Sequence, residues 1–132
     1  MDRQLKRARI AHHEAAHAVI GRAVGLTVTK VRRYSVGLGP FDPELATEEL
    51  QFLFAGMYAD VRLLTEHGYP RAKALRMAKP PAGHDLRAAR SLVRSMRKDY
   101  QTRLNLKRAE RDAARLVDRH WASITRMANK HL

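Results

Sequence analysis

The sequence contains no cysteine, and aromatic residues make up only 6% of it. Without cysteine there are no disulfide bonds and no thiolate metal ligands, so any metal site must use histidine, aspartate or glutamate. The few aromatic residues are not interleaved with the basic ones. A surface that stacks nucleic-acid bases would need that interleaving, so a base-stacking platform is disfavoured.

Long apolar runs and phosphate-binding loops are also missing. No stretch of 18 apolar residues predicts a membrane span, and no G-x-x-x-x-G-K-[ST] loop predicts an ATPase. The N-terminal segment is basic and then apolar, but His12, His13, Glu14 and His17 would interrupt a signal-peptide core. We therefore expect one domain over residues 1–132, cytoplasmic and without a membrane span.

Acidic residues are few, with 13 Asp and Glu against 26 Lys and Arg, which gives a net charge of +13. This balance favours polyanionic partners such as nucleic acid, an anionic membrane surface or an acidic protein. The arginines are spread over residues 3 to 9, 30 to 33 and 87 to 126, mostly on predicted helix surfaces. Solvated helix faces are the favoured explanation of that pattern, and nucleic-acid binding through the basic surface is kept as an alternative hypothesis.

Hydrophobic periodicity predicts a mainly α domain with one short strand region near 27–36, where β-branched and aromatic residues alternate with others. The glycine- and proline-rich stretch 37–43 predicts a loop after that strand. We expect helices over residues 4–24, from 44 or 48 to 66, over 85–100 and over 105–131, with a short helical turn over 71–78.

The most specific motif is His13-Glu-Ala-Ala-His17, a complete H-E-x-x-H pentad within the first predicted helix. Four residues are slightly more than one helical turn, so His13 and His17 project from one face and can bind one metal ion. Glu14 lies about a quarter-turn away, where a carboxylate can take a proton from a water activated by zinc. The pentad predicts a Zn²⁺-dependent hydrolase with Glu14 as the general base.

A catalytic zinc site needs a third protein ligand and an open position for water. The longer H-E-x-x-H-x-x-G-x-x-H motif is absent, so the third ligand must come from further along the chain. The candidates are Asp60, Glu66, His84, Asp85 and His120. Asp85 is also a natural N-cap for the helix predicted to begin there.

Three segments together resemble the protease domain of the FtsH family of membrane-anchored AAA+ zinc metalloproteases. They are Ala11-His-His-Glu-Ala-Ala-His-Ala-Val-Ile20, Phe54-Ala-Gly-Met-Tyr-Ala-Asp60 and Gly83-His-Asp-Leu-Arg-Ala-Ala-Arg90. In that family H-E-A-G-H is followed by a G-G-R-x-A-E helix and then by N-D-L-x-x-A-x-x-x-A. This chain departs from the pattern at Ala16, His84 and Asp60, which stand at the family's glycine, asparagine and glutamate positions.

The resemblance implies an FtsH-protease-like helical zinc metallopeptidase domain, with His13, His17 and Asp85 as ligands and Glu14 as general base. The 132 residues contain no counterpart of the family's membrane anchors or ATPase ring, so we expect a stand-alone peptidase domain that acts on flexible or unfolded polypeptides. A separate ATPase or unfoldase is a possible partner, and the oligomeric state stays open.

Five other residues receive weaker assignments. Asp60 is either an outer partner of a ligand histidine or a solvated helix residue, and His84, next to Asp85, is a candidate for stabilising an oxyanion. His12 points away from the ligand face and is expected on the helix surface. His120 and the adjacent Trp121 are expected at the boundary of the core.

Two alternatives to the endopeptidase stay open. The first is a catalytically weak or inactive metal-binding regulatory domain with affinity for nucleic acid or another polyanion, which the net charge of +13 supports. The second is a zinc hydrolase that acts on a non-peptide amide or ester.

Overall fold

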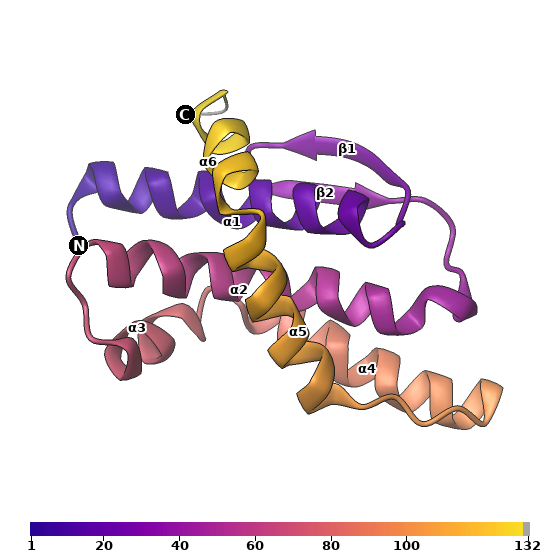
Figure 1. Ribbon diagram of the computed structural model, residues 1–132. Coiled ribbons are helices and arrows are strands. Elements are labelled where there is room, and N and C mark those ends of the chain that lie inside the picture. Colours follow the sequence, from indigo (N-terminus) through magenta and orange to yellow (C-terminus); the bar gives the residue numbers. More distant parts are fainter. Residues whose placement is uncertain (131–132) are drawn as a thin grey trace.

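The computed structural model describes residues 1–130 and confirms a mainly α chain (Figure 1). In order, its elements are α1 (Arg3–Ala23), β1 (Val28–Arg32), β2 (Ser35–Leu38), a 3-10 turn (Pro43–Leu45), α2 (Ala46–Glu66), α3 (Arg71–Ala78), α4 (Gly83–Tyr100), α5 (Leu106–Arg119) and α6 (Trp121–Lys130). None of the helices in this part of the chain is long and apolar enough to cross a membrane.

Helices α1 and α2 lie side by side and run in opposite directions at the centre of the molecule (Figure 1). The Asp2 carboxylate caps the start of α1 by accepting the Leu5 N–H at 2.7 Å. Alanines occupy much of the contact between the two helices, including the fully buried Ala16, Ala55 and Ala59. Such small side chains allow the two backbones to approach closely, which matters for the histidines on α1.

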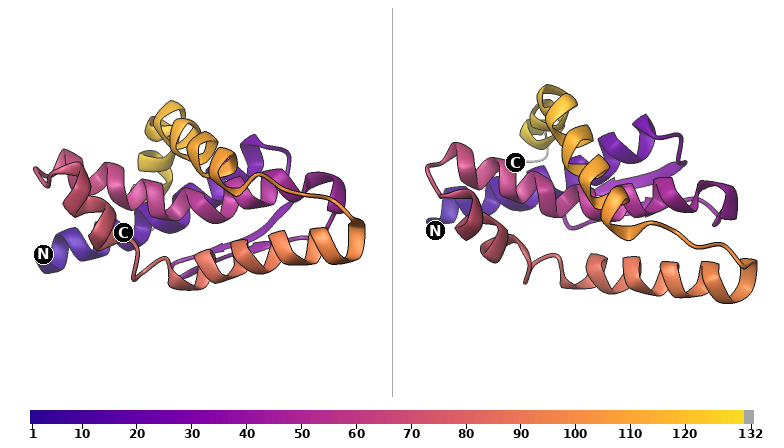
Figure 2. Two further views of the ribbon diagram at one scale, coloured as in Figure 1. Left: turned by 90° about the horizontal axis from the view of Figure 1, so that it is seen from below. Right: turned by 60° about the horizontal axis from the view of Figure 1, so that its bottom comes forward.

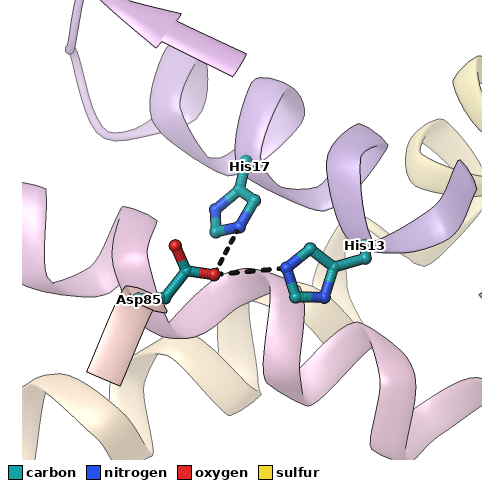
Figure 3. A group of neighbouring side chains, drawn as sticks. All are labelled: His13, His17 and Asp85. Atoms are coloured by element: carbon teal, nitrogen blue, oxygen red, sulfur yellow. Dashed lines mark hydrogen bonds and ion pairs between the residues drawn. The ribbon is translucent and has the colours of Figure 1, made fainter. Parts of the chain in front are cut away.

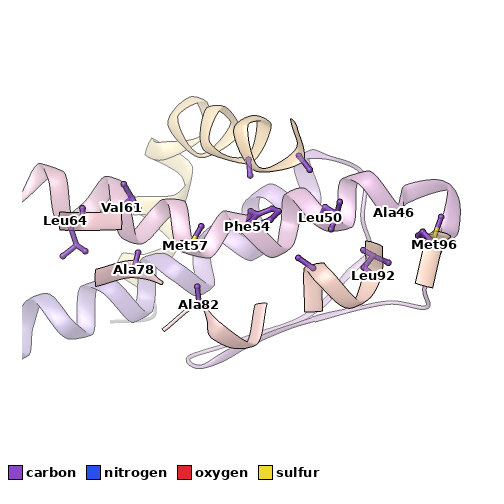
Figure 4. Close-up of a cluster of buried hydrophobic side chains, with 14 residues drawn as sticks. Ala46, Leu50, Phe54, Met57, Val61, Leu64, Ala78, Ala82, Leu92 and Met96 are labelled. Carbon is purple, nitrogen blue, oxygen red and sulfur yellow. The ribbon is translucent and has the colours of Figure 1, made fainter. Parts of the chain in front are cut away.

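Helices α4 and α5 pack on opposite sides of α2 (Figure 2). The α4 side is an apolar cluster that contains Leu50, Phe54 and Met57 of α2 together with Leu92 and Met96 of α4 (Figure 4). A buried Ala82 ends the preceding turn. This packing holds the first turn of α4 beneath α1.

The strand region is a hairpin rather than a single strand, so the prediction for residues 27–36 was only partly correct. Strands β1 and β2 pair antiparallel, with Val31 opposite Val36, and the chain turns at Arg33 and Tyr34. Strand β2 also runs through Gly37 into the predicted loop. The sequence lacks the Asn-Gly or Asp-Gly signal typical of a two-residue turn, and the turn was therefore missed.

The predicted helix over 105–131 is broken at His120, which separates α5 from α6. No proline or glycine marks this position, so the periodicity continues across it. The break turns α6 back onto α1, where Ile124 and Ala128 join the buried cluster of α1. Residue 131 lies outside the described residues.

Candidate metal centre

Three potential metal ligands from two distant segments converge between α1 and the first turn of α4 (Figure 3). Asp85 Oδ2 lies 3.2 Å from His13 Nε2 and 3.1 Å from His17 Nε2. One ligand atom from each of the three residues lies within 4.8 Å of the other two. The structure thus brings together the two pentad histidines and the aspartate that the family resemblance implied.

Hydrogen bonds on the other ring nitrogens orient both histidines. His17 Nδ1 lies 2.7 Å from the Phe52 carbonyl oxygen, which can only accept, so this nitrogen carries the proton. His13 Nδ1 lies 3.1 Å from Asp60 Oδ2, and the carboxylate selects the same tautomer. Nε2 is therefore the ring nitrogen that each histidine turns toward Asp85. A neutral ring could bind a metal ion through this atom, and a protonated ring donates from it to the carboxylate.

Asp60 is fully buried in α2, so its interpretation as a solvated helix residue is wrong. Its Oδ2 lies 3.0 Å from Arg9 Nη1 as well as near His13. The other oxygen, Oδ1, has no hydrogen-bond partner among the described residues. Arg9 and His13 are therefore the groups that compensate the buried carboxylate, and Arg9 acts on the centre through Asp60.

Gly56 allows α2 to pass directly against the two ligand histidines. A Cβ atom at this position would overlap His13 Nε2 and would lie 2.6 Å from His17 Nε2. Real Cβ atoms do not approach other heavy atoms that closely, so a larger residue would displace the imidazoles or the helix. The presence of glycine at position 56 is therefore explained by the lack of space for a side chain beside the two histidines.

The charges at the centre favour a cation among the three ligand atoms. Burial opposes a protonated His13 ring, but hydrogen bonds to Asp60 and Asp85 outweigh it and raise the pKa of His13 to about 10. Burial likewise opposes an ionised Asp85, yet the two histidines hold its pKa well below the usual range. In the metal-free protein the protonated His13 ring supplies this positive charge.

The same donor set fits zinc. Two imidazole nitrogens and one carboxylate oxygen are common ligands of catalytic zinc, and ligand atoms about 2.1 Å from a tetrahedral ion lie roughly 3.4 Å apart. The observed separations of 3.1 and 3.2 Å are slightly shorter. All three ligand atoms lie within 4.8 Å of one another, so side-chain shifts would be needed to place them around an ion. The hydrogen bonds at Nδ1 already turn both Nε2 atoms toward that position.

Glu14 is half-buried on α1, beside the ligand histidines. Burial raises the pKa of its carboxyl group, while the positive charge of His17 and His13 opposes that change. A carboxylate with a raised pKa holds a transferred proton better than an exposed one does. Glu14 is thus suited to accept and return a proton at this centre.

Several residues named from the sequence lie elsewhere. His84 is exposed at the start of α4, and Glu66 accepts a hydrogen bond from Trp121 Nε1 at 3.2 Å. His12 is buried, with its ring stacked on Trp121 at a centroid distance of 5.2 Å, so its expected place on the surface was wrong. The α6 turn that brings Trp121 there had no sequence signal.

Asp85 is not the N-cap of α4. The helix begins at Gly83, so Asp85 is its third residue. Ala82 holds the N-cap position, and no side chain makes a capping hydrogen bond there. The carboxylate is consequently free to face the histidines.

Two contributors to the centre were missed, Arg9 and the Phe52 carbonyl. Arg9 precedes His13 by four residues, and this helical spacing was a usable signal. The Phe52 carbonyl could not be predicted, because every residue has a backbone carbonyl group whatever its side chain.

Comparisons with protein-family models, curated proteins and solved structures find no match to this chain. The functional argument therefore rests on the residues and geometry of the centre.

Proposed function

We propose that this chain is an FtsH-like zinc endopeptidase that hydrolyses peptide bonds of flexible or unfolded polypeptides. The observation that carries the proposal is the convergence of His13, His17 and Asp85 with Glu14 beside them. A structural helix pair has no need of three metal-type ligands with both histidine tautomers selected. Non-peptide amides and esters are the alternative substrates.

In this proposal His13, His17 and Asp85 hold zinc, which when bound polarises a carbonyl group and acidifies water. Glu14 takes the proton from the attacking water and passes it to the leaving amine. Asp60 and the Phe52 carbonyl keep the two imidazoles oriented during these proton transfers.

The proposed substrate is an extended polypeptide because the hairpin offers a place for it. In the described structure β1 and β2 form a two-stranded sheet, so each strand has one edge without a strand partner. An added strand forms backbone hydrogen bonds that tolerate many sequences. Folded proteins cannot bind in this way, and a separate unfoldase would be needed to supply them.

The test compares casein cleavage by zinc-loaded wild type and Glu14→Gln. We expect the variant to retain stoichiometric zinc and lose roughly 10²- to 10⁴-fold in rate, because it keeps the ligands and lacks the base. Metal content and mass spectrometry of the products are the measurements. If neither protein cleaves casein or a broad peptide panel while both hold zinc, the peptidase proposal is wrong and a metal-binding regulatory domain is favoured.

A panel of non-peptide amides and esters separates the remaining alternative. The alternative is favoured if wild type hydrolyses these compounds but no peptide, and if Glu14→Gln has lost this hydrolysis. The protein would then be a zinc hydrolase of another kind.

A further inference from the structure

An open cavity of about 1020 Å³ lies between the N-terminal half of α1 and the turn of the hairpin. Leu5, Ala8 and Ile10 contribute apolar surface from α1, while Arg33 and Tyr34 contribute from the hairpin turn. The Arg33 guanidinium lies over the Tyr34 ring, 5.5 Å from its centroid. The volume is at the upper end for a ligand site, and the lining combines apolar and charged groups.

Two arginines line this cavity from different elements. Arg7 comes from α1 and Arg33 from the hairpin turn, and both are exposed. In the described part of the chain neither guanidinium lies within ion-pair distance of a carboxylate, unlike Arg9 and Arg62. Asp2 also lines the cavity, but its carboxylate caps α1. The arginines therefore present unneutralised positive charge to any occupant.

The cavity follows α1 away from Glu14. Arg7, Ile10 and Ala11 line it, and they precede Glu14 by seven, four and three residues, the spacing of one helix face. Seven residues of helix correspond to about 10 Å. An extended polypeptide covers that distance in about three residues.

The hairpin leads to the same cavity. Its strands contact α1, and Figure 1 shows both strands alongside this helix. The turn at Arg33 and Tyr34 then opens onto the cavity. A substrate strand added to the hairpin would therefore pass the cavity on leaving the metal centre.

We propose that this cavity is a substrate subsite in which Arg7 and Arg33 bind acidic side chains about three residues from the scissile bond. The inference rests on the proposed peptidase function for its reference to a scissile bond. Arginine suits the role because its guanidinium group binds a carboxylate through two hydrogen bonds. The occupant is thus an extended polypeptide segment with Asp or Glu at this distance.

The test measures peptide binding to zinc-loaded Glu14→Gln by fluorescence anisotropy, so that no cleavage intervenes. Three labelled ten-residue peptides share one neutral sequence: the first carries two glutamates beginning three residues before the central bond, the second carries them equally far after it, and the third has glutamines instead. We expect one acidic peptide to bind about three- to tenfold more tightly than the glutamine peptide, because two exposed ion pairs contribute modestly.

The diagnostic variant adds Arg7→Gln and Arg33→Gln, and its matched control adds Arg90→Gln and Arg94→Gln on the exposed side of α4. Both remove two positive charges. The ratio of the affinities for the acidic and the glutamine peptide should fall to about one in the diagnostic variant and should persist in the control. Equal loss in both variants would show a general charge effect and overturn the subsite, as would the absence of any glutamate preference.

The outcomes also separate this inference from the peptidase proposal. Arginine-dependent glutamate preference without casein cleavage by wild type would keep the subsite and reject the peptidase. Casein cleavage by wild type without the glutamate preference would keep the peptidase and reject the subsite.

Discussion

The chemistry of the centre depends on which nitrogen of each histidine is free. His13 and His17 both use Nδ1 for a protein partner, Asp60 in one case and the Phe52 carbonyl in the other. Both Nε2 atoms then face Asp85. Histidines that bind a metal ion almost always have an outer partner that selects this tautomer, and both of these rings have one.

Asp85 should be essential for tight metal binding. We expect Asp85→Ala to weaken zinc affinity by at least about a hundredfold, because two histidines alone leave the ion one protein ligand short. Competition with a coloured chelator measures the affinity. Asp99→Ala, an exposed substitution near the other end of α4, is the matched control and should bind zinc as wild type does. Unchanged affinity in Asp85→Ala would remove this residue from the site.

At the scale of single residues, the sequence predicted the reactive groups better than their supports. The spacing of His13, Glu14 and His17 follows from helix geometry alone. Asp85 was one of five open candidates until the family resemblance implied it. Asp60 and Arg9 are supports whose roles depend on burial, and burial of a single aspartate is not visible in the sequence.

Among the helices, α2 supplies both the outer partners and the space for the ligand histidines. Its Phe52 and Asp60 contact the histidine rings, and Gly56 lies between them in the chain. The absence of a side chain at Gly56 is thus a property of the site as well as of the helix.

Gly56→Ala should disturb the metal centre although alanine favours helices. The added Cβ would overlap the ligand imidazoles, so we expect weaker zinc binding and a loss of about 1–3 kcal/mol in the free energy of unfolding. Chelator competition and urea unfolding measure the two effects. Gly83→Ala is the helical control, since its Cβ would meet only the end of the Arg87 side chain, at 3.2 Å. Equal behaviour of the two variants would contradict the steric role of Gly56.

The element boundaries that the sequence missed have a common cause. Both the hairpin turn at Arg33 and the helix break at His120 lack glycine and proline. Local propensity therefore continues through them, and long-range packing makes the chain turn. The break at His120 lets Trp121 stack on His12, a contact that periodicity could not predict.

For the whole molecule, the residues of the candidate metal centre couple stability to pH. In the metal-free protein the pKa of His13 is raised from 6.5 to about 10, so protonated His13 stabilises the fold. That contribution is fully present below pH 6.5 and is lost as pH rises toward 10. The pKa of Asp85 is lowered, so the ionised Asp85 carboxylate also stabilises the fold. This contribution to stability is lost only as the pH falls into the acid range.

Metal-free protein should therefore become less stable between pH 6.5 and 9, and zinc affinity should rise over the same range because His13 must lose its proton to bind the ion. One released proton corresponds to about a tenfold gain in affinity per pH unit. Urea unfolding without metal and chelator competition with zinc measure the two trends. His13→Gln should flatten the unfolding trend. A metal-free protein that gains stability from pH 7 to 9 would contradict the charge balance described for the centre.

The large positive charge followed from composition alone. The mainly helical structure and the two pentad histidines on one face followed from the order of residues, because helix periodicity is a local property. The meeting of these histidines with Asp85, the burial of Asp60 beside Arg9 and the cavity at the hairpin turn required the packed chain. His13 is separated from Asp60 by 47 positions and from Asp85 by 72. Contacts over such distances depend on how the helices pack, and the spacing of residues within one helix does not specify that packing.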